Sequence, residues 1–384
     1  MLYTISSCGT IRYMKINRSS KIHFTKWLTA TKQGQIDVFL VEYARIVNLF
    51  IIAYEDQIPD VKKMELLYAK YTQPMITGSG TWLSARSVKH AFQEGYGMVQ
   101  GAKSNAKDDD KKYYRPVHYG KKAVLSSNNN TQDVPNLTNF DFMVTLGSLG
   151  NKIKIAIPLK KHKQFIKWDT LGKRSSTVTL TREYVMFSFE IETGEKKEPD
   201  GRYLGIDIGM NILAATSMGD MFGEELRSML DQLANKKQYS KGYYRKKEEI
   251  KEYINYQLKK IPLSELTLVV VEKLKNLKHK TKLKRRLSKN VRRVISNWCY
   301  RQVLDRIQML CEENRVSFRS VPAYYTSQEC ASCGYIDKKN RLSQSEFICQ
   351  SCGHTDNADL NASKNILNRF ITGPYGASYQ LNSF

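Results

Sequence analysis

The chain has 384 residues, 61 of them Lys or Arg and 37 Asp or Glu, and this length allows two or three domains with cores of their own. The formal net charge of +24 favours a polyanionic partner such as nucleic acid, with a ribosomal-type basic protein or a membrane-surface binder as alternatives. No run of about 18 apolar residues is present, which argues against a membrane span, and the first ten residues lack the charged-then-apolar order of a secretory signal.

The first hundred residues predict a strand followed by helices. Residues 10–16 have the alternation of a strand, and a turn is expected at residues 17–20. Over residues 37–51 the apolar side chains recur at helical spacing. A second helix is expected over residues 83–102, followed by a charged, poorly ordered connector at residues 103–112.

The rest of the first half returns to the period of a strand. Between residues 140 and 191 separate stretches carry apolar side chains at every second position, which predicts at least four short strands at the spacing of a barrel or sandwich. Aromatics and lysines mix in residues 160–168, a pattern that suits base stacking with phosphate contacts. A solvated edge with Trp168 in the core is the alternative. Residues 195–201, charged and holding Pro199 and Gly201, form the predicted linker.

Two strands of the second half each hold one acid. Residues 203–208 predict a short buried strand that contains Asp207, and residues 266–272 predict a second apolar strand that ends in Glu272. A buried carboxylate is destabilising unless a cation or a hydrogen-bond donor compensates it. A strand-end Asp that caps the next turn is the ordinary alternative for Asp207.

Two further acids, Asp356 and Asp359, precede a helix that is predicted over residues 360–369. Either could be only a cap of that helix, and the residues alone do not choose between them as a ligand. If one of them meets Asp207 and Glu272 at one edge of a sheet, the three carboxylates indicate a divalent-metal site.

The densest basic run of the chain follows the second acidic strand. Residues 273–293 contain eleven Lys or Arg and no acid, which favours a nucleic-acid track over an ordinary solvated face. A helix over residues 290–313 and a strand over residues 315–321 come next, and interleaved strands and helices indicate an α/β layer. The predicted contacts to nucleic acid are Lys282, Lys284, Arg285, Arg286, Arg292 and Arg293.

Four of the seven cysteines form a predicted zinc site. Cys330 and Cys333 form one C-x-x-C turn and Cys349 and Cys352 another, with fifteen residues between the turns and a glycine directly after each. Four thiolates complete the tetrahedral shell of a structural zinc and leave no open position. Two redox dithiols or a disulfide pair are the alternative, which the expected reducing compartment disfavours.

The motifs of the second half resemble those of the TnpB nucleases of insertion sequences, which are related to the compact type V CRISPR effectors. The resemblance covers about residues 200–370. It rests on Gly205-Ile-Asp-Ile-Gly209, Val271-Glu-Lys-Leu274, Tyr325-Thr-Ser-Gln328 before the first cysteine pair, and Asp359-Leu-Asn-Ala362.

The resemblance implies an α/β multidomain protein with a RuvC-like nuclease domain of RNase H fold at residues 201–327 and 356–370. A zinc ribbon would occupy residues 328–355 and a tail residues 371–384. The first half would be a wedge β-barrel, residues 1–34 and 113–200, interrupted by a helical recognition insert, residues 35–112.

The resemblance also implies a mechanism and partners. Asp207, Glu272 and Asp359 would hold two Mg²⁺ ions, and the four cysteines one structural zinc. One active site would hydrolyse both strands of target DNA beside a short flanking motif, directed by a guide RNA with one protein for each RNA, in the cytoplasm of a bacterium or archaeon. A compact CRISPR effector, a guide-directed repressor with weak or no cleavage, and a guide-free zinc-ribbon protein are the alternatives.

Overall fold

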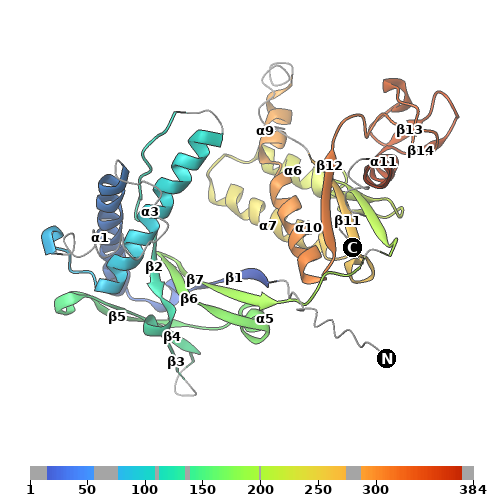
Figure 1. Cartoon of the computed structure of the whole chain (residues 1–384). Helices are drawn as coiled ribbons and strands as arrows, with labels where there is room; N and C mark the ends of the chain where they lie inside the picture. The colour runs from blue at the N-terminus through green and yellow to red at the C-terminus, as the bar shows by residue number, and fades with distance from the viewer. Residues whose placement is uncertain are drawn as a thin grey trace, which may run out of the picture. The chain divides into compact units, whose positions relative to one another are not determined.

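The computed structural model describes residues 15–55, 77–108, 112–134, 139–198, 200–273 and 287–373. Contacts divide the described residues into two compact units, Lys15–Glu192 and the residues from Thr193 onward. Figure 1 shows helices and sheets in both.

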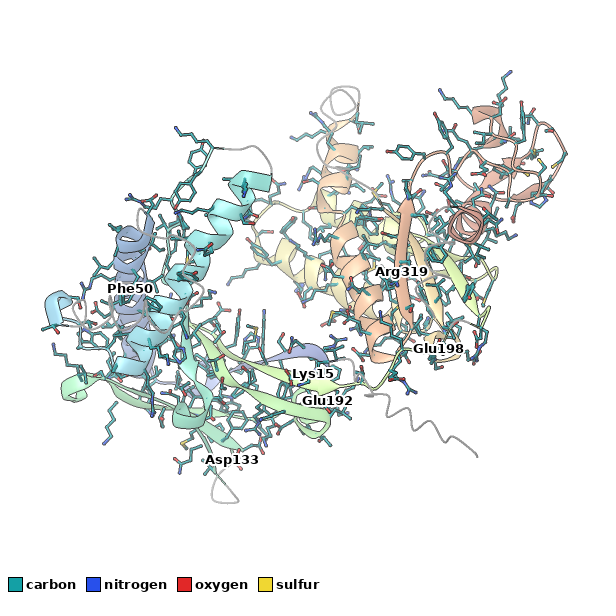
Figure 2. All side chains as sticks on the ribbon, viewed as in Figure 1. Lys15, Phe50, Asp133, Glu192, Glu198 and Arg319 are labelled. Atoms are coloured by element: carbon teal, nitrogen blue, oxygen red, sulfur yellow. The ribbon has the colours of Figure 1, made fainter. Side chains whose placement is uncertain are left out.

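Two antiparallel sheets form the frame of the Lys15–Glu192 unit. A four-stranded sheet has the order β1-β7-β6-β2, and a three-stranded sheet the order β3-β4-β5. At one end of the larger sheet Lys15 of β1 lies opposite Glu192 of β7 (Figure 2). The strands are β1 (Lys15–His23), β2 (Lys122–Ser126), β3 (Thr131–Asp133), β4 (Phe142–Gly147), β5 (Lys154–Leu159), β6 (Gly172–Thr181) and β7 (Tyr184–Glu192).

The predicted turn at residues 17–20 is wrong, because these residues lie in the middle of β1. Their inward-facing positions are polar and hide the alternation: Arg18 and Ser20 are both buried. Ser20 Oγ lies 3.3 Å from His162 Nε2, and Arg18 donates to the carbonyl of Asn17. The predicted strand at residues 10–16 falls mostly outside the described residues.

An aromatic cluster joins α5 (Lys163–Leu171) to these sheets. The ring of Phe165 lies 5.2 Å from that of Phe187 and 5.4 Å from that of Phe142, and Trp168 is also buried. Aromatic rings at such separations stabilise a core beyond their buried area. Trp168 is therefore a core residue, as the alternative interpretation of residues 160–168 expects, and the base-stacking interpretation is wrong for it.

Helices α1 (Ala30–Glu55) and α3 (Ala85–Asp108) pack against each other through an edge-to-face pair, Phe50 and Phe92. The predicted connector at residues 103–112 is wrong for its first part, because α3 continues to Asp108. Lys103 Nζ donates to the carbonyl of Glu55, 2.8 Å away, at the negative end of α1. A cation at a helix C-terminus is stabilising, which gives the charged segment a reason to stay helical.

A five-stranded sheet of order β10-β9-β8-β11-β12 organises the unit from Thr193 onward. Strands β8, β11 and β12 are parallel, whereas β9 and β10 run antiparallel to their neighbours. The strands are β8 (Tyr203–Asp207), β9 (Ala214–Thr216), β10 (Met221–Phe222), β11 (Leu268–Lys273) and β12 (Ser317–Pro322).

The two faces of this sheet are covered by different helices (Figure 1). Val269 and Val271 of β11 pack into the core formed with α6 (Leu226–Asn235), α7 (Lys241–Leu258), α9 (Lys289–Asn297) and α10 (Tyr300–Glu313). Leu268 and Val270 point the other way, toward α11 (Ala358–Thr372). A sheet with both faces covered explains why the first four residues of this strand, 268–271, are all apolar.

The single helix predicted over residues 290–313 is wrong, because the chain breaks between α9 and α10. Trp298 adopts an extended conformation and its side chain is buried in the core. The break directs Tyr300 so that its hydroxyl donates to the carbonyl of Glu272. Burial of the large indole outweighs the continuation of the helix.

Candidate functional site

Two predicted acids lie side by side at the carboxyl edge of the five-stranded sheet. Asp207 is the last residue of β8, and Glu272 is the penultimate residue of β11. These strands are parallel with Ile206 opposite Val271, so the next residue of each is an acid. In open α/β sheets the carboxyl edge of the parallel strands is where ligands bind.

Helix α11 brings the third acid to the same edge. The side chain of Asn357 caps the helix by accepting hydrogen bonds from the backbone N–H groups of Asp359 and Leu360, and this places Asp359 in the first turn. The helix approaches β8 closely at Gly205, where a Cβ would lie 2.2 Å from the carbonyl oxygen of Ser363. Only glycine fits this contact.

The charges of Glu272 and Asp359 both act on Asp207. Burial, followed by the negative charges of Glu272 and Asp359, raises the pKa of Asp207 to about 7, against the opposing charge of Arg341. The pKa of Glu272 is also raised by burial, although the hydrogen bond from Thr326 opposes this. The protein thus gathers more negative charge here than its own cations compensate.

Two residues that the sequence did not single out contact these acids. Thr326 Oγ1 donates to Glu272 Oε1. Arg341 Nη2 lies 3.0 Å from Asp359 Oδ1, and the Arg341 guanidinium is also held by the carbonyls of Ser343 and Gln344. Thr326 lies inside the Thr-Ser-Gln motif, so the motif was a signal. Arg341 lies between the two cysteine pairs and had none.

Asp356 has a different environment from Asp359. Lys364 Nζ lies 2.8 Å from Asp356 Oδ2, and the backbone N–H of Asn357 donates to Oδ1. The charge of Asp359 contributes to the raised pKa of Asp207. Asp359, in the first turn of α11, is therefore the acid whose charge reaches Asp207.

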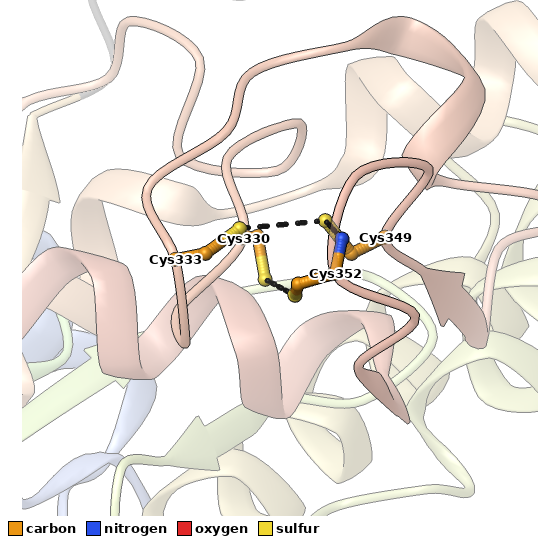
Figure 3. A group of neighbouring side chains, drawn as sticks. All are labelled: Cys330, Cys333, Cys349 and Cys352. Atoms are coloured by element: carbon orange, nitrogen blue, oxygen red, sulfur yellow. Dashed lines mark hydrogen bonds between the residues drawn. The ribbon is translucent and has the colours of Figure 1, made fainter.

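The four predicted zinc ligands come together at the tips of two turns (Figure 3). All their sulfur atoms lie within 4.8 Å of one another, and Cys330–Cys352 and Cys333–Cys349 are separated by 3.8 and 3.6 Å. Four sulfurs at the corners of a tetrahedron about 2.3 Å from a zinc ion lie about 3.8 Å apart. The arrangement therefore fits a structural zinc.

The backbone around the second pair also favours thiolate. Burial opposes ionisation of Cys349, but the backbone N–H groups of Cys352 and Ser351, together with the side chains of Cys333 and Cys352, lower the pKa of Cys349 to about 6. A glycine follows each pair with a positive φ, +75° at Gly334 and +72° at Gly353. These tight turns direct the N–H groups toward the sulfurs.

Polar side chains of α11 hold the cysteine-bearing segment, residues 328–355, against the helix that covers the sheet. Asn361 Nδ2 donates to the carbonyl of Glu329, and Asn361 Oδ1 accepts from the backbone N–H of Ala331. Asn365 Nδ2 donates to the carbonyls of Glu329 and Thr326. One helix therefore fixes Asp359, Thr326 and the first cysteine pair in a common frame.

The predicted nucleic-acid contacts are only partly described. Lys282, Lys284, Arg285 and Arg286 lie outside the described residues. Arg292 is exposed on α9, whereas Arg293 is half-buried and donates to the carbonyl of Lys236, 2.6 Å away. Arg293 therefore ties α9 to the loop after α6.

The helices of the described residues include none with the length and hydropathy that crossing a membrane requires.

Comparison with known proteins supports the motif analysis. Residues 300–366 match the model of the Cas12f1-like TNB domain. The chain is 29% identical over 221 residues to Putative RNA-guided DNA endonuclease InsQ of Escherichia coli (strain K12), a match that covers 48% of this chain and 53% of InsQ. It is 36% identical over 97 residues to a TnpB-like protein of Aquifex aeolicus (strain VF5), covering 25% of this chain and 30% of that one.

The chain thus spans about half of InsQ and less of the second relative. Its fold resembles that of the mini-RNA-guided endonuclease CRISPR-Cas_phi3, with a TM-score of 0.56 over 96% of this chain and 95% of the other at 9% identity. The α/β fold and the cysteine cluster agree with these matches. Residues 300–366 thus match a Cas12f1-like domain, and the chain is similar to TnpB-like proteins and compact type V CRISPR effectors.

Proposed function

We propose that the protein is an RNA-guided DNA endonuclease of an insertion sequence. One acidic site, formed by Asp207, Glu272 and Asp359, would hydrolyse phosphodiester bonds in both strands of a target beside a short flanking motif. The observation that carries the proposal is the placement of these acids: Asp207 and Glu272 end paired parallel strands at one edge of the sheet, and Asp359 in the first turn of α11 is near enough for its charge to raise the pKa of Asp207. The names of InsQ and of the Cas_phi3 structure describe RNA-guided endonucleases.

The acidic site has the donors that magnesium prefers. Carboxylate oxygens are hard ligands, and three of them with an uncompensated charge would be stabilised by divalent cations. When bound, two Mg²⁺ ions supply stabilisation of the attacking and leaving oxygens of an in-line displacement. Asp207, Glu272 and Asp359 would hold the ions, while the hydroxyl of Thr326 fixes the orientation of Glu272.

Arg341 has a separate role in this proposal. Its guanidinium compensates part of the negative charge at Asp359 and lowers the pKa of Asp207. An arginine remains protonated at any working pH and presents several donors in a fixed plane. It would therefore contact the phosphate of the substrate when the acids are occupied by cations, which makes the cysteine-bearing segment part of the active site.

The partners follow from charge and from the relatives. A net charge of +24 suits a guide RNA and double-stranded target DNA. We propose the wedge barrel at residues 1–34 and 113–200, the recognition insert at residues 35–112, the RuvC-like domain at residues 201–327 and 356–370, and a zinc ribbon at residues 328–355.

Two measurements test the function. The RNA that co-purifies with the protein is sequenced, and the complex is then incubated with a plasmid that carries the matching target. We expect one dominant RNA with a variable 3′ portion, and magnesium-dependent cleavage that Asp207→Asn abolishes and Asp356→Asn retains. Random cellular RNA, or equal cleavage by both variants, contradicts the proposal.

The origin of the RNA separates the two RNA-guided alternatives. An RNA transcribed from the end of the element itself indicates an insertion-sequence nuclease, and one from a spacer array indicates a CRISPR effector. Guided binding without cleavage by the wild type would instead favour a repressor.

A further inference from the structure

Two adjacent tyrosines follow β12 with their side chains in solvent. Tyr324 is 73% exposed and Tyr325 58% exposed. Within the described ranges no ring contact and no hydrogen bond of either hydroxyl is found. Exposed apolar residues are common singly, but two neighbouring large aromatic rings without a partner point to a ligand.

The pair lies beside the acidic site. Strand β12 runs parallel to β11 with Val321 opposite Glu272, so the chain leaves β12 at the edge where the acids lie. Thr326, the residue directly after the pair, donates its hydroxyl hydrogen to Glu272. The tyrosines are therefore connected to a proposed catalytic carboxylate by one residue.

The backbone that carries the rings is held in place. Arg369 Nη1 donates to the carbonyls of Pro322 and Tyr324, and Asn365 Nδ2 donates to that of Thr326. Tyr325 itself has φ of +61°, a left-handed conformation that residues with a Cβ rarely adopt. Such strain persists only where surrounding contacts impose it, and it concentrates at functional sites.

We propose that Tyr324 and Tyr325 form a stacking platform for an unpaired nucleobase of the DNA strand that enters the acidic site. The inference rests on the proposed function. Because the backbone is fixed and the rings have no partner, stacking a base on them costs little conformational entropy. Stacking accepts any base, which suits an enzyme whose guide RNA selects the sequence. Bases inside a duplex are already stacked, so the platform selects a single strand.

The first experiment measures single-turnover cleavage of target DNA by the complete protein–RNA complex. Replacing Tyr324 or Tyr325 by Ala should slow cleavage at subsaturating DNA by about 5- to 100-fold, the range of a lost base–aromatic stack, whereas Phe variants should retain the rate. Substrates with an abasic nucleotide placed in turn near the cut should slow the wild type at one position. At that position the abasic nucleotide should slow the Ala variant only a little beyond the loss of rate that Ala already causes.

A matched control is available in Tyr239, which is 78% exposed and also has a positive φ, +64°, but lies in the loop between α6 and α7. Tyr239→Ala should cleave at the wild-type rate. Three results would overturn the platform. The cleavage rate could be unchanged in both Ala variants, or the Phe variants could be as slow as the Ala variants. The losses of rate caused by Ala and by the abasic nucleotide could also multiply. Unchanged rates are also the result if the rings dock a protein instead of DNA.

A second experiment separates this proposal from the proposed function. The complex of the Asp207→Asn variant is titrated with a fluorescent single-stranded thymidine oligonucleotide, a measurement that needs no cleavage. Ala at Tyr324 or Tyr325 should weaken binding about 5- to 100-fold relative to Tyr239→Ala. If the wild type cuts no DNA but this difference is present, the nuclease proposal fails and the platform stands. Equal binding overturns the platform.

Discussion

The raised pKa of Asp207 predicts how the stability of the magnesium-free protein changes with pH. A carboxyl whose pKa rises from 3.8 to about 7 on folding binds its proton more tightly in the folded state. Its contribution to stability is complete below the unfolded pKa and is lost as pH rises through the folded one. Asp207→Asn keeps the shape of the neutral acid, so it should be more stable than the wild type above about pH 7.

The size of the effect follows from the shift. At about 1.4 kcal/mol for each pKa unit, the difference between variant and wild type reaches about 4 kcal/mol above pH 7. Of this, about 2 kcal/mol develops between about pH 5.5 and about pH 7. Bound magnesium stabilises the folded wild type by mass action, so adding it should reduce the difference.

The assay is urea unfolding followed by circular dichroism, with EDTA excluded to keep zinc in place and the zinc content of each sample measured. An opposite-sign control is Asp200, whose pKa is held low by hydrogen bonds from Arg202. Asp200→Asn should lose stability at neutral pH and not at acid pH. A difference for Asp207→Asn that stays constant, or shrinks as pH rises, would refute the proposed charge cluster.

Three further outcomes are expected. Gly205→Ala should destabilise the protein by about 2 kcal/mol or more in thermal unfolding, because its Cβ meets the backbone of α11, whereas Gly97→Ala in the open face of α3 should be neutral or stabilising. Thr326→Val should lower the cleavage rate about tenfold or more, with Thr326→Ser close to wild type, because only the hydroxyl contacts Glu272; equal rates would contradict this. Cys349→Ala should release zinc, as measured in a colorimetric assay. It should also reduce the cleavage rate about 100-fold, as much as Arg341→Ala does, because the loop between the cysteine pairs carries Arg341 to Asp359.

The role of the cysteine-bearing segment is the main mechanistic consequence of the fold. A closed set of four thiolates has no open position for chemistry. The segment nevertheless reaches the acidic site through Arg341, while Asn361 and Asn365 of α11 fix its first turn. In the proposed function, zinc would support catalysis by holding this frame rather than by binding substrate.

Local patterns were sufficient for features that depend on neighbouring residues. The apolar run of β11, the stripe of α1 and the strand that holds Asp207 follow from periodicity, since each element buries a face with its own repeat. The cysteine spacing predicted the cluster of four sulfurs, because two short turns bring their own ligands together. The order of the motifs predicted the similarity to TnpB-like proteins that the comparison found.

Prediction failed where distant partners change the local preference. The polar residues inside β1 read as a turn because only His162, far along the chain, reveals that Ser20 faces a structured interior. The helix break at Trp298 depends on a core assembled from several helices.

The acidic site shows the same division most clearly. The primary sequence determined which residues carry charge, and the motifs singled out Asp207, Glu272 and Asp359. Only the tertiary structure decided that Arg341 and Thr326 contact two of them and that Tyr324 and Tyr325 lie at the same edge. The reason is physical: a pKa, an ion pair or an exposed ring depends on separations in space that spacing along the chain does not encode.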